Sequence, residues 1–318
     1  MVIQMKVRLG YVALSKTIDN LTTSSTITYT NYKEKNYTVD KLLEITKNNL
    51  DNLYKLLTYN IKNNIHFYRL TSKLVPLATH NDVNFDYITP LKKTYEKIGN
   101  LINNNNIRID THPDQLAVLN STDKKIVDNT YEILEYHYKI LDALNIKEKI
   151  IILHVGSSVL GKKTSISRFI NNFNKLPNYI KKCIAVENDD KIYNTIDVLE
   201  ICKKLNIPMV LDYHHFICNN DSEKLENYIK NIMDTWKTLN PKFHFSSPKS
   251  KLKKEFRSHH DYIDVDEFIK FINILKPYNK DVDIMLEAKN KDDALFRLVR
   301  QLKYKTNYKF IDETTFIV

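Results

Sequence analysis

Short apolar runs rich in β-branched and aromatic residues recur along the chain at intervals of about 30 to 40 residues, separated by segments with helical spacing of apolar positions. We expect β-strands at 6–12, 65–70, 107–111, 149–154, 183–187, 208–212, 242–246 and 283–287. The expected helices lie at about 40–63, 82–104, 122–143, 163–180, 190–204, 221–236, 264–276 and 290–302. Eight strands alternating with eight helices are typical of an α/β fold, the single (β/α)8 or TIM barrel.

One barrel accounts for the whole chain, residues 1–318. This length is large for an ordinary domain but normal for an α/β barrel, and no linker or change in composition divides the sequence. Residues 303–318 follow the last expected helix as a C-terminal tail, and the sequence assigns no role to them.

The composition is that of a globular protein, with 42% hydrophobic and 27% charged residues. Lys6 and Arg8 interrupt the apolar N-terminus, and no later apolar run approaches the length that crosses a bilayer. The three cysteines form no CxxC pair, which suits a reducing compartment. We therefore expect a protein without a membrane segment that stays inside the cell, in the cytoplasm or nucleoid.

The net charge of +10 favours a polyanionic partner such as DNA. Lys, Asn and Ile are abundant throughout, however, and Gly numbers only four. An AT-rich coding sequence, from a bacterium or a large DNA virus, would produce the same bias. The charge is therefore supporting evidence only.

Histidines and carboxylates stand at or just after the predicted strand ends, where the catalytic groups of TIM barrels lie. The set comprises His80, His112, His154, Glu187, Asp212, His215, His244, His259, His260 and Glu287. Imidazole and carboxylate without suitably spaced cysteines suit Zn²⁺, Mn²⁺ or Fe²⁺. One catalytic ion uses about three protein ligands, so the set predicts two or three ions. Such clusters activate water for in-line displacement at phosphorus, and a phosphodiester is the expected substrate.

Lys242 is an unusual neighbour for such a site. Residues two apart in a strand point the same way, so Lys242 and His244 share a face. An ammonium group beside several divalent cations is electrostatically unfavourable. We expect Lys242 to be turned away, deprotonated or covalently modified, and a carbamate formed with carbon dioxide would make it a carboxylate-like ligand.

Motifs across nearly the whole chain resemble those of the UV damage endonucleases. They are RLGY at 8–11, PLATH at 76–80, THPDQ at 111–115, LHVG at 153–156, VENDD at 186–190, LDYHH at 211–215, PKFHFSS at 241–247 and SHHDY at 258–262. The resemblance implies a TIM barrel related to endonuclease IV. It implies manganese-dependent incision of the phosphodiester 5′ to cyclobutane pyrimidine dimers and 6-4 photoproducts, with abasic sites as a further substrate, leaving a 3′-hydroxyl and a 5′-phosphate.

The same resemblance implies roles for individual residues. One metal ion would be held by His112, His154 and Glu187, a second by Glu187, Asp212, His244 and Glu287, and a third by His215 and His260. Lys242 matches a carboxylated lysine, and His80 matches a further active-site histidine. Glu187, Lys242 and His80 are therefore the expected catalytic residues.

DNA recognition is expected from two further groups. Tyr11 and Gln115 match residues that probe damaged bases, and Leu116 stands where relatives often have tyrosine, so it can act only as an apolar wedge. The loop after the seventh strand is basic and would bind phosphates through Lys249, Lys251, Lys253, Lys254 and Arg257.

Three other functions remain open at this point. They are an abasic-site nuclease, a metal-dependent sugar isomerase and a DNA damage-binding protein without catalysis. The positive charge disfavours a small neutral sugar, and so full a set of metal ligands disfavours a non-catalytic protein. The leading hypothesis is a monomeric repair endonuclease that acts on double-stranded DNA containing UV lesions.

Overall fold

A closed ring of eight parallel strands forms the centre of the protein, in this computed structural model, which describes residues 4–114 and 116–318. The strands are β1 (Lys6–Val12), β2 (Phe67–Leu70), β3 (Arg108–Thr111), β4 (Ile151–His154), β5 (Ile184–Glu187), β6 (Met209–Asp212), β7 (Lys242–Phe245) and β8 (Val282–Leu286). Neighbours pair in chain order, and β1 closes the ring by pairing with both β8 and β2. The predicted TIM barrel is confirmed.

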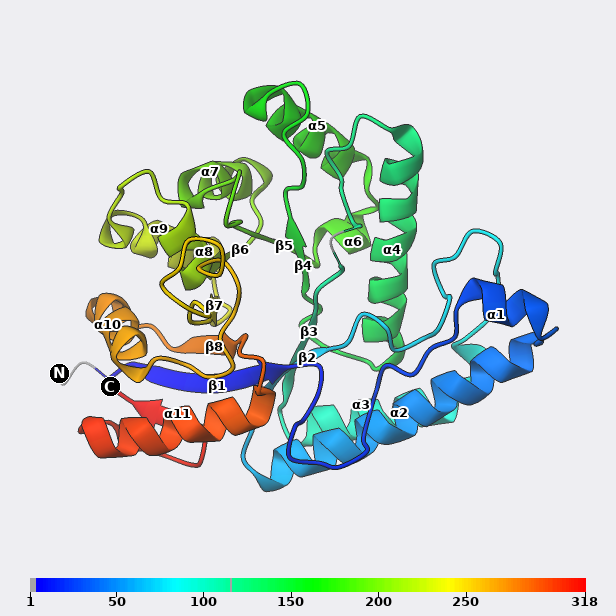
Figure 1. Ribbon diagram of the computed structural model, residues 1–318, viewed down its shortest axis with the longest axis horizontal. Coiled ribbons are helices and arrows are strands. Elements are labelled where there is room, and N and C mark those ends of the chain that lie inside the picture. The colour runs from blue at the N-terminus through cyan, green and yellow to red at the C-terminus, as the bar shows by residue number, and fades with distance from the viewer. Residues whose placement is uncertain (1–3, 115) are drawn as a thin grey trace.

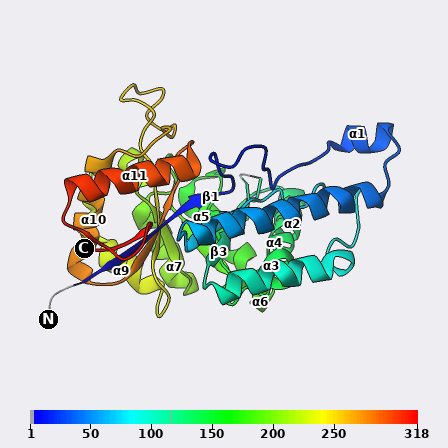
Figure 2. The same cartoon turned by 90° about the horizontal axis from the view of Figure 1, so that it is seen from below.

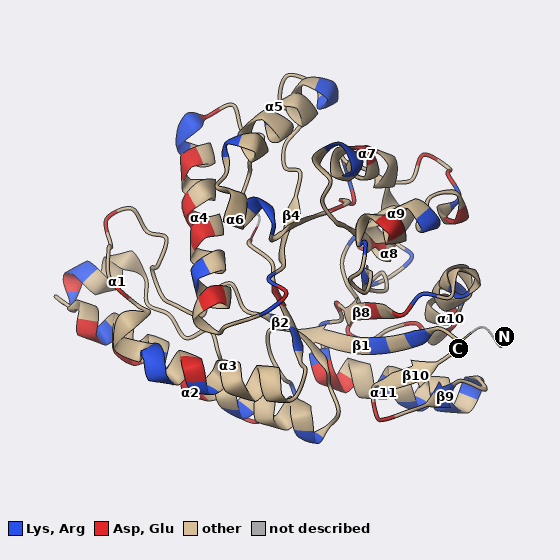
Figure 3. Cartoon of the chain, turned by 180° about the vertical axis from the view of Figure 1, so that it is seen from behind, with Lys and Arg blue, Asp and Glu red and all other residues tan. Residues whose placement is uncertain are grey.

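Helices surround the strands, as Figure 1 shows. They are α1 (Tyr29–Glu34), α2 (Val39–Lys62), α3 (Lys92–Asn104), α4 (Lys124–Ala143), α5 (Lys162–Lys175), α6 (Asn178–Lys181), α7 (Thr195–Leu205), α8 (Tyr213–Cys218), α9 (Ile229–Thr235), α10 (Val265–Leu275) and α11 (Lys291–Lys305). Basic and acidic residues both occur along α2, so this long helix carries charges of both signs (Figure 3). In the described part of the chain, no helix is long and apolar enough to cross a membrane.

Three expected helices differ from the structure. The helix expected at 82–104 begins only at Lys92, after a 3₁₀ turn in which Pro90 occupies the first helical turn. The helix expected at 163–180 is divided at Pro177 into α5 and α6, because proline lacks the backbone donor that a continuous helix needs. The segment 221–236 contributes only the short 3₁₀ turn Leu225–Asn227 and α9.

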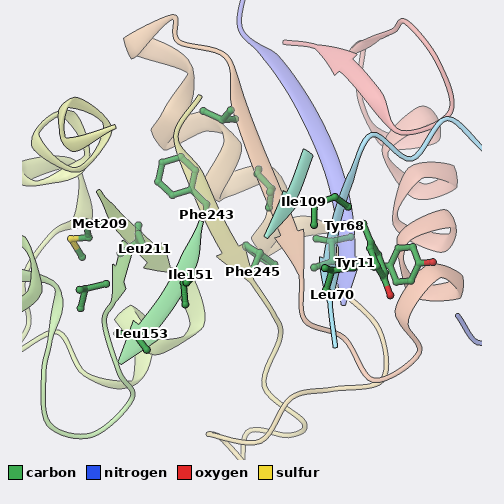
Figure 4. Packing of buried hydrophobic residues seen from close by; sticks show 14 of the residues in the cluster. Tyr11, Tyr68, Leu70, Ile109, Ile151, Leu153, Met209, Leu211, Phe243 and Phe245 are labelled. Atoms are coloured by element: carbon green, nitrogen blue, oxygen red, sulfur yellow. The ribbon is translucent and has the colours of Figure 1, made fainter. Parts of the chain in front are cut away.

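Alternation along the strands separates the apolar outer layer from the barrel interior. Phe243 and Phe245 (labelled in Figure 4) belong to the buried apolar cluster. They point outward, and the ring of Phe245 packs against those of Phe268 and Phe271 on α10 at centroid distances of 5.1 and 5.6 Å. Lys242 and His244 alternate with these phenylalanines and are fully buried on the opposite face. The shared inward face predicted for Lys242 and His244 is therefore present.

The end of the barrel interior at the amino ends of the strands, called here the lower half, contains an ion-paired cluster. Asp283 on β8 accepts hydrogen bonds from Arg8 Nε at 2.6 Å and from Arg108 Nη1 at 2.7 Å. The Arg108 guanidinium also lies over the rings of Phe67 and Trp236, at 5.7 and 5.2 Å from their centroids. Charge pairing and cation–π contact together offset the cost of burying these groups.

The C-terminal residues complete the barrel wall instead of forming a separate tail. Beyond α11, β9 (Lys309–Phe310) and β10 (Thr315–Ile317) form an antiparallel pair, and β10 lies antiparallel to the first half of β1. Leu9 N donates to Thr314 O at 3.0 Å. β1 pairs with β2 only at Tyr11 and Val12, so β10 supplies backbone partners to the part of β1 that β2 does not reach.

Candidate metal centre

Seven side chains at or just after the carboxyl ends of six strands meet at the barrel mouth. They form three adjoining groups, namely His112, His154 and Glu187; Glu187, Asp212 and His215; and Asp212, His244 and Glu287. Within each group the candidate ligand atoms all lie within 4.8 Å of one another. The closed barrel thus brings together residues that are spread over 176 positions of sequence, since His112 and Glu287 share one rim.

Glu187 is the shared centre of this cluster. Its Oε1 lies 3.0 Å from His244 Nδ1 and 3.4 Å from His215 Nδ1, and its Oε2 lies 3.1 Å from His112 Nε2. Burial opposes ionisation of this carboxyl, but His244, His154 and the hydrogen-bonding histidines hold its pKa well below the usual range. An ionised carboxylate with histidines on both oxygens has the arrangement of a bridging ligand.

The pKa of Asp212 is shifted in the opposite direction to that of Glu187. Burial, only partly offset by His215, raises the pKa of its carboxyl to about 6. Its Oδ1 accepts a hydrogen bond from His215 N at 2.8 Å and so caps α8, whereas Oδ2 has no partner among the described residues. His154 Nδ1 is also buried and without a partner in that part of the chain. Two buried atoms of ligand type without a partner are what a cation site would require.

Backbone carbonyls orient the histidine rings. His112 Nδ1 lies 2.8 Å from Pro113 O, and His215 Nδ1 lies 2.9 Å from Asn188 O. A nitrogen that faces a carbonyl carries the proton, which leaves Nε2 of each ring as the atom free to bind metal. This pattern of ring N–H donating to a carbonyl is the one that metal-ligating histidines usually have.

His259 shares that pattern, and His260 does not. His259 Nδ1 lies 2.9 Å from Glu287 O and 4.0 Å from Glu287 Oε2. Its ring centroid is 6.4 Å from that of His215. His260 is exposed, and its Nδ1 accepts a hydrogen bond from Tyr262 N at 2.9 Å. Among the described contacts, His259 therefore lies beside the candidate ligand Glu287, whereas His260 does not.

Arg69, at the end of β2, is a site residue that the sequence interpretation missed. Its Nη1 donates to Glu287 Oε1 at 2.6 Å, its Nη2 contacts His244 Nε2, and its Nε lies 3.4 Å from Asp110 Oδ1. Arg69 is buried and so brings a fixed positive charge to the carboxylates of the mouth. The signal was present in the sequence, since Arg69 is the one charged residue of the strand segment IHFYRL.

Lys242 lies inside the barrel, where its Nζ is hydrogen-bonded to Asp110 Oδ2. Burial lowers the pKa of Lys242 to about 7, while Asp110 opposes that shift. The pKa of Asp110 is itself lowered, because Lys242 and Arg69 outweigh its burial. Lys242 and Asp110 thus form a buried salt bridge, in which Asp110 favours the ammonium form of Lys242.

The remaining predicted residues lie in different surroundings. His80 stacks on Tyr29 of α1 with ring centroids 4.0 Å apart, and its described contacts do not include the cluster. Tyr11 does not fit a DNA contact, because it is fully buried and its hydroxyl donates to Asn60 of α2 at 2.7 Å. Leu116 is 68% exposed, as a wedge requires, and Gln115 lies outside the described residues.

The basic loop after β7 extends beyond the helices at one end of the barrel (Figure 2). All five predicted basic side chains are on the exposed surface, namely Lys249, Lys251, Lys253, Lys254 and Arg257. Two of them have acidic partners, since Lys249 Nζ lies 3.0 Å from Glu255 and Arg257 Nε lies 3.5 Å from Asp190. The other three offer their charge to solvent or to a polyanion.

The fold and the site define a TIM-barrel protein with a candidate metal centre at its mouth, the architecture of endonuclease IV. Endonuclease IV from Thermus thermophilus superimposes with a TM-score of 0.59 over 93% of this chain and 98% of that chain, at 10% identity, and so shows the fold alone.

This chain belongs to the UV-endonuclease UvdE family, whose model matches residues 7–315. A UV DNA damage endonuclease of Bacillus cereus (strain B4264) is 44% identical over 304 residues, which cover 94% of this chain and 95% of that protein. The crystal structure of SacUVDE is similar with a TM-score of 0.86 and 34% identity over 94% of this chain and 98% of that chain. The protein is accordingly a DNA repair endonuclease, and DNA is its substrate.

Proposed function

We propose that this endonuclease depends on two to three divalent metal ions, in the first place Mn²⁺ and in the second Zn²⁺. It would incise the phosphodiester immediately 5′ to cyclobutane pyrimidine dimers and 6-4 photoproducts in double-stranded DNA, with abasic sites as a further substrate, and leave a 3′-hydroxyl and a 5′-phosphate. The observation that supports metal dependence is the set of three adjoining histidine and carboxylate groups in which Asp212 Oδ2 and His154 Nδ1 have no partner within the described chain.

The residues would share the ions as their grouping suggests. His112, His154 and Glu187 would hold one, Asp212 with His244 and Glu287 a second, and His215 a third, with His259 in the place first assigned to His260. The chemistry that such ions supply is activation of a water and neutralisation of charge on the attacking and leaving oxygens. Glu187 would bridge two groups and fix their spacing.

The protein residues would prepare the site in two ways. The carbonyls of Pro113 and Asn188 hold the imidazoles of His112 and His215 in one tautomer, so that Nε2 of each ring stays available. Burial of Glu187 and His244 keeps bulk water from competing for them, which strengthens electrostatic interactions at the phosphate.

Lys242 is the proposed position of carboxylation, as the family resemblance implies. A carbamate at Nζ would place a second anion against Asp110, so its formation requires that Asp110 gives up the present contact. We expect the unmodified ion pair in the metal-free protein, and a carbamate only once bound metal ions balance the added charge. A carbamate resonance in ¹³C NMR with labelled bicarbonate and Mn²⁺, lost in Lys242→Arg, would support this.

DNA would lie across the barrel mouth. Exposed Leu116 would enter the base stack at the lesion, and Lys251, Lys253 and Lys254 would contact phosphates, with an affinity that falls as salt rises. Tyr11 is not part of this proposal, because it is buried against α2. We further propose that the enzyme acts as a monomer, inside the cell where its DNA substrate is.

The decisive experiment uses end-labelled duplexes that contain one cyclobutane dimer, one 6-4 photoproduct, one abasic site or no lesion. With Mn²⁺, the photoproduct duplexes should be cut at the 5′ side with a ligatable 3′-hydroxyl, and chelation should abolish cutting. Cutting of the abasic duplex alone would favour an abasic-site nuclease. Binding without any cutting would favour a damage-binding protein, and either result would refute the proposed activity.

A further inference from the structure

The turn between β4 and α5 carries two exposed apolar side chains. Val159 and Leu160, called here the apolar tip, are 51% and 73% exposed. We propose that the apolar tip is a second DNA-contacting wedge, which packs against bases or sugars of the duplex beside the position reached by Leu116. This inference rests on the proposed function, because it assumes that damaged duplex DNA lies across the barrel mouth.

Leu160 has a backbone conformation that leucine disfavours. Gly161 N donates to Ser158 O at 2.9 Å and closes a four-residue turn, in which Leu160 is the third residue with a φ of 66°. Glycine or asparagine is the usual residue at such a position, because a larger side chain is strained there. Leucine thus makes the turn less stable and also exposes apolar surface, so folding gives no reason for its presence.

The apolar tip is nevertheless held firmly. The carbonyl of Val159 accepts hydrogen bonds from Ser165 Oγ at 2.9 Å and from Arg168 Nη2 at 2.5 Å. Arg168 Nε also donates to Asn120 O at 3.0 Å. A turn that is fixed in this way loses little conformational entropy when it binds a partner, which favours a role in recognition.

Asn120 joins the apolar tip to the loop that carries Leu116. Its Nδ2 donates to Ser157 O at 2.6 Å, and its Oδ1 accepts from Ser157 N at 2.9 Å. Gly156, with a φ of 111°, permits this approach, since a Cβ there would lie 2.5 Å from Asn120 Oδ1. The loops after β3 and β4 therefore form one platform, which starts at the candidate ligands His112 and His154.

The charge around the apolar tip indicates DNA as its occupant. Lys162 and Lys163 follow the turn directly, and Lys163 is exposed, whereas Lys162 Nζ lies 2.5 Å from Asp197. Apolar side chains flanked by lysines suit a duplex, because the lysines meet phosphates while the apolar groups enter between or beside bases. The net charge of +10 supports the same partner.

The test compares Leu160→Asn and Leu160→Gly with wild type. Both residues accept a positive φ, so the thermal midpoint should stay the same or rise. Affinity for a duplex with one photoproduct should fall by about tenfold, because a leucine that becomes partly buried against DNA on binding is lost. Fluorescence of 2-aminopurine beside the lesion should report less unstacking, while Mn²⁺ binding by calorimetry stays unchanged. The matched control is Ile311→Asn, which removes an apolar side chain that is 55% exposed between β9 and β10.

Stability and DNA affinity should thus move in different directions, which a purely structural leucine would not produce. If wild type cuts photoproduct DNA and both variants bind it as tightly as wild type does, the second wedge is refuted while the proposed function stands. Loss of self-association in the variants with unchanged DNA affinity would also overturn it, since the tip would then contact another copy of the chain. A wild type that neither binds nor cuts damaged DNA would refute the proposed function itself.

Discussion

The two halves of the barrel interior both contain charged residues, but they differ in which sign of charge is in excess. Below, Asp283 accepts from Arg8 and Arg108, and both of its oxygens have partners. At the mouth, three carboxylates lie close together, namely Glu187, Asp212 and Glu287. A single buried carboxylate held between two arginines stabilises the fold, whereas several adjoining carboxylates and histidines with unpartnered ligand atoms indicate a site for a cation.

Arg69 stands between these two regions. It contacts Glu287 above and Asp110 below, so the same guanidinium belongs to the candidate metal centre and to the ion-paired interior. Removing residues from each region should therefore separate effects on metal binding from effects on folding.

The largest effect is expected for Glu187→Gln at the mouth. The amide keeps the size of the side chain but removes the negative charge shared by two ligand groups. Incision with saturating Mn²⁺ should fall on the order of 10³-fold, and calorimetry should show fewer bound ions. Circular dichroism serves as the folding control. Wild-type incision by this variant would rule out the bridging role.

Asp283→Asn should affect stability instead of metal binding. It leaves the buried Arg108 and the half-buried Arg8 without their counter-charge, and the free energy of unfolding measured with urea should fall by about 3 to 5 kcal/mol. The matched control is Asp281→Asn, which breaks the exposed pair with Lys6 at 3.0 Å and should cost less than about 1 kcal/mol. Equal losses in the two variants would show that the lower cluster does not stabilise the barrel.

Arg69→Gln should have an intermediate effect on Mn²⁺ affinity. Loss of a residue that orients a candidate ligand typically weakens metal binding about 10- to 100-fold, and Arg69 holds Glu287 in place. Arg69→Lys keeps the charge but not the forked contact, so its Mn²⁺ affinity should lie between those of wild type and Arg69→Gln. A rise in Mn²⁺ affinity would mean that the guanidinium mainly competes with the ions.

The smallest effect concerns acid stability and arises outside the barrel interior, at His137 on α4. Burial lowers the pKa of His137 to about 3, whereas the unfolded chain takes up its proton near the ordinary value of about 6.5. The folded state therefore loses stability as pH falls below about 6.5, by about 1.4 kcal/mol at pH 5.5. Urea unfolding at pH 7.5 and 5.5, with chelator, should show this loss in wild type and less of it in His137→Leu. Equal pH dependence in both proteins would contradict the assignment.

The sequence predicted the order and inward face of the strands well. Seven of the eight expected ranges contain the observed strand, and β8 is displaced by one residue, because alternating apolar positions are a local signal. The tail was not understood, since the pairing of β10 with β1 joins residues more than 300 positions apart. No local sequence pattern predicts such a partner.

Some residues of the candidate site were likewise predicted from the sequence, and others were found only in the structure. His112, His154, Glu187, Asp212, His215, His244 and Glu287 were found from their positions at strand ends, and the structure brings them together. Which of the adjacent His259 and His260 lies beside Glu287 depends on the fold of the loop after β7. Arg69 and Asp110 were missed, although both stand in predicted strands, because only their partners reveal what they do.

By itself, the sequence determined that strands and helices alternate and that ligand-type side chains stand where strands end. Both properties follow from the two-residue repeat of a strand and from the residue types present. Only the tertiary structure decided which buried charges neutralise one another, which histidine faces the mouth and what closes the barrel beside β1. These depend on the register of a closed sheet, which sets distances between residues far apart in the chain.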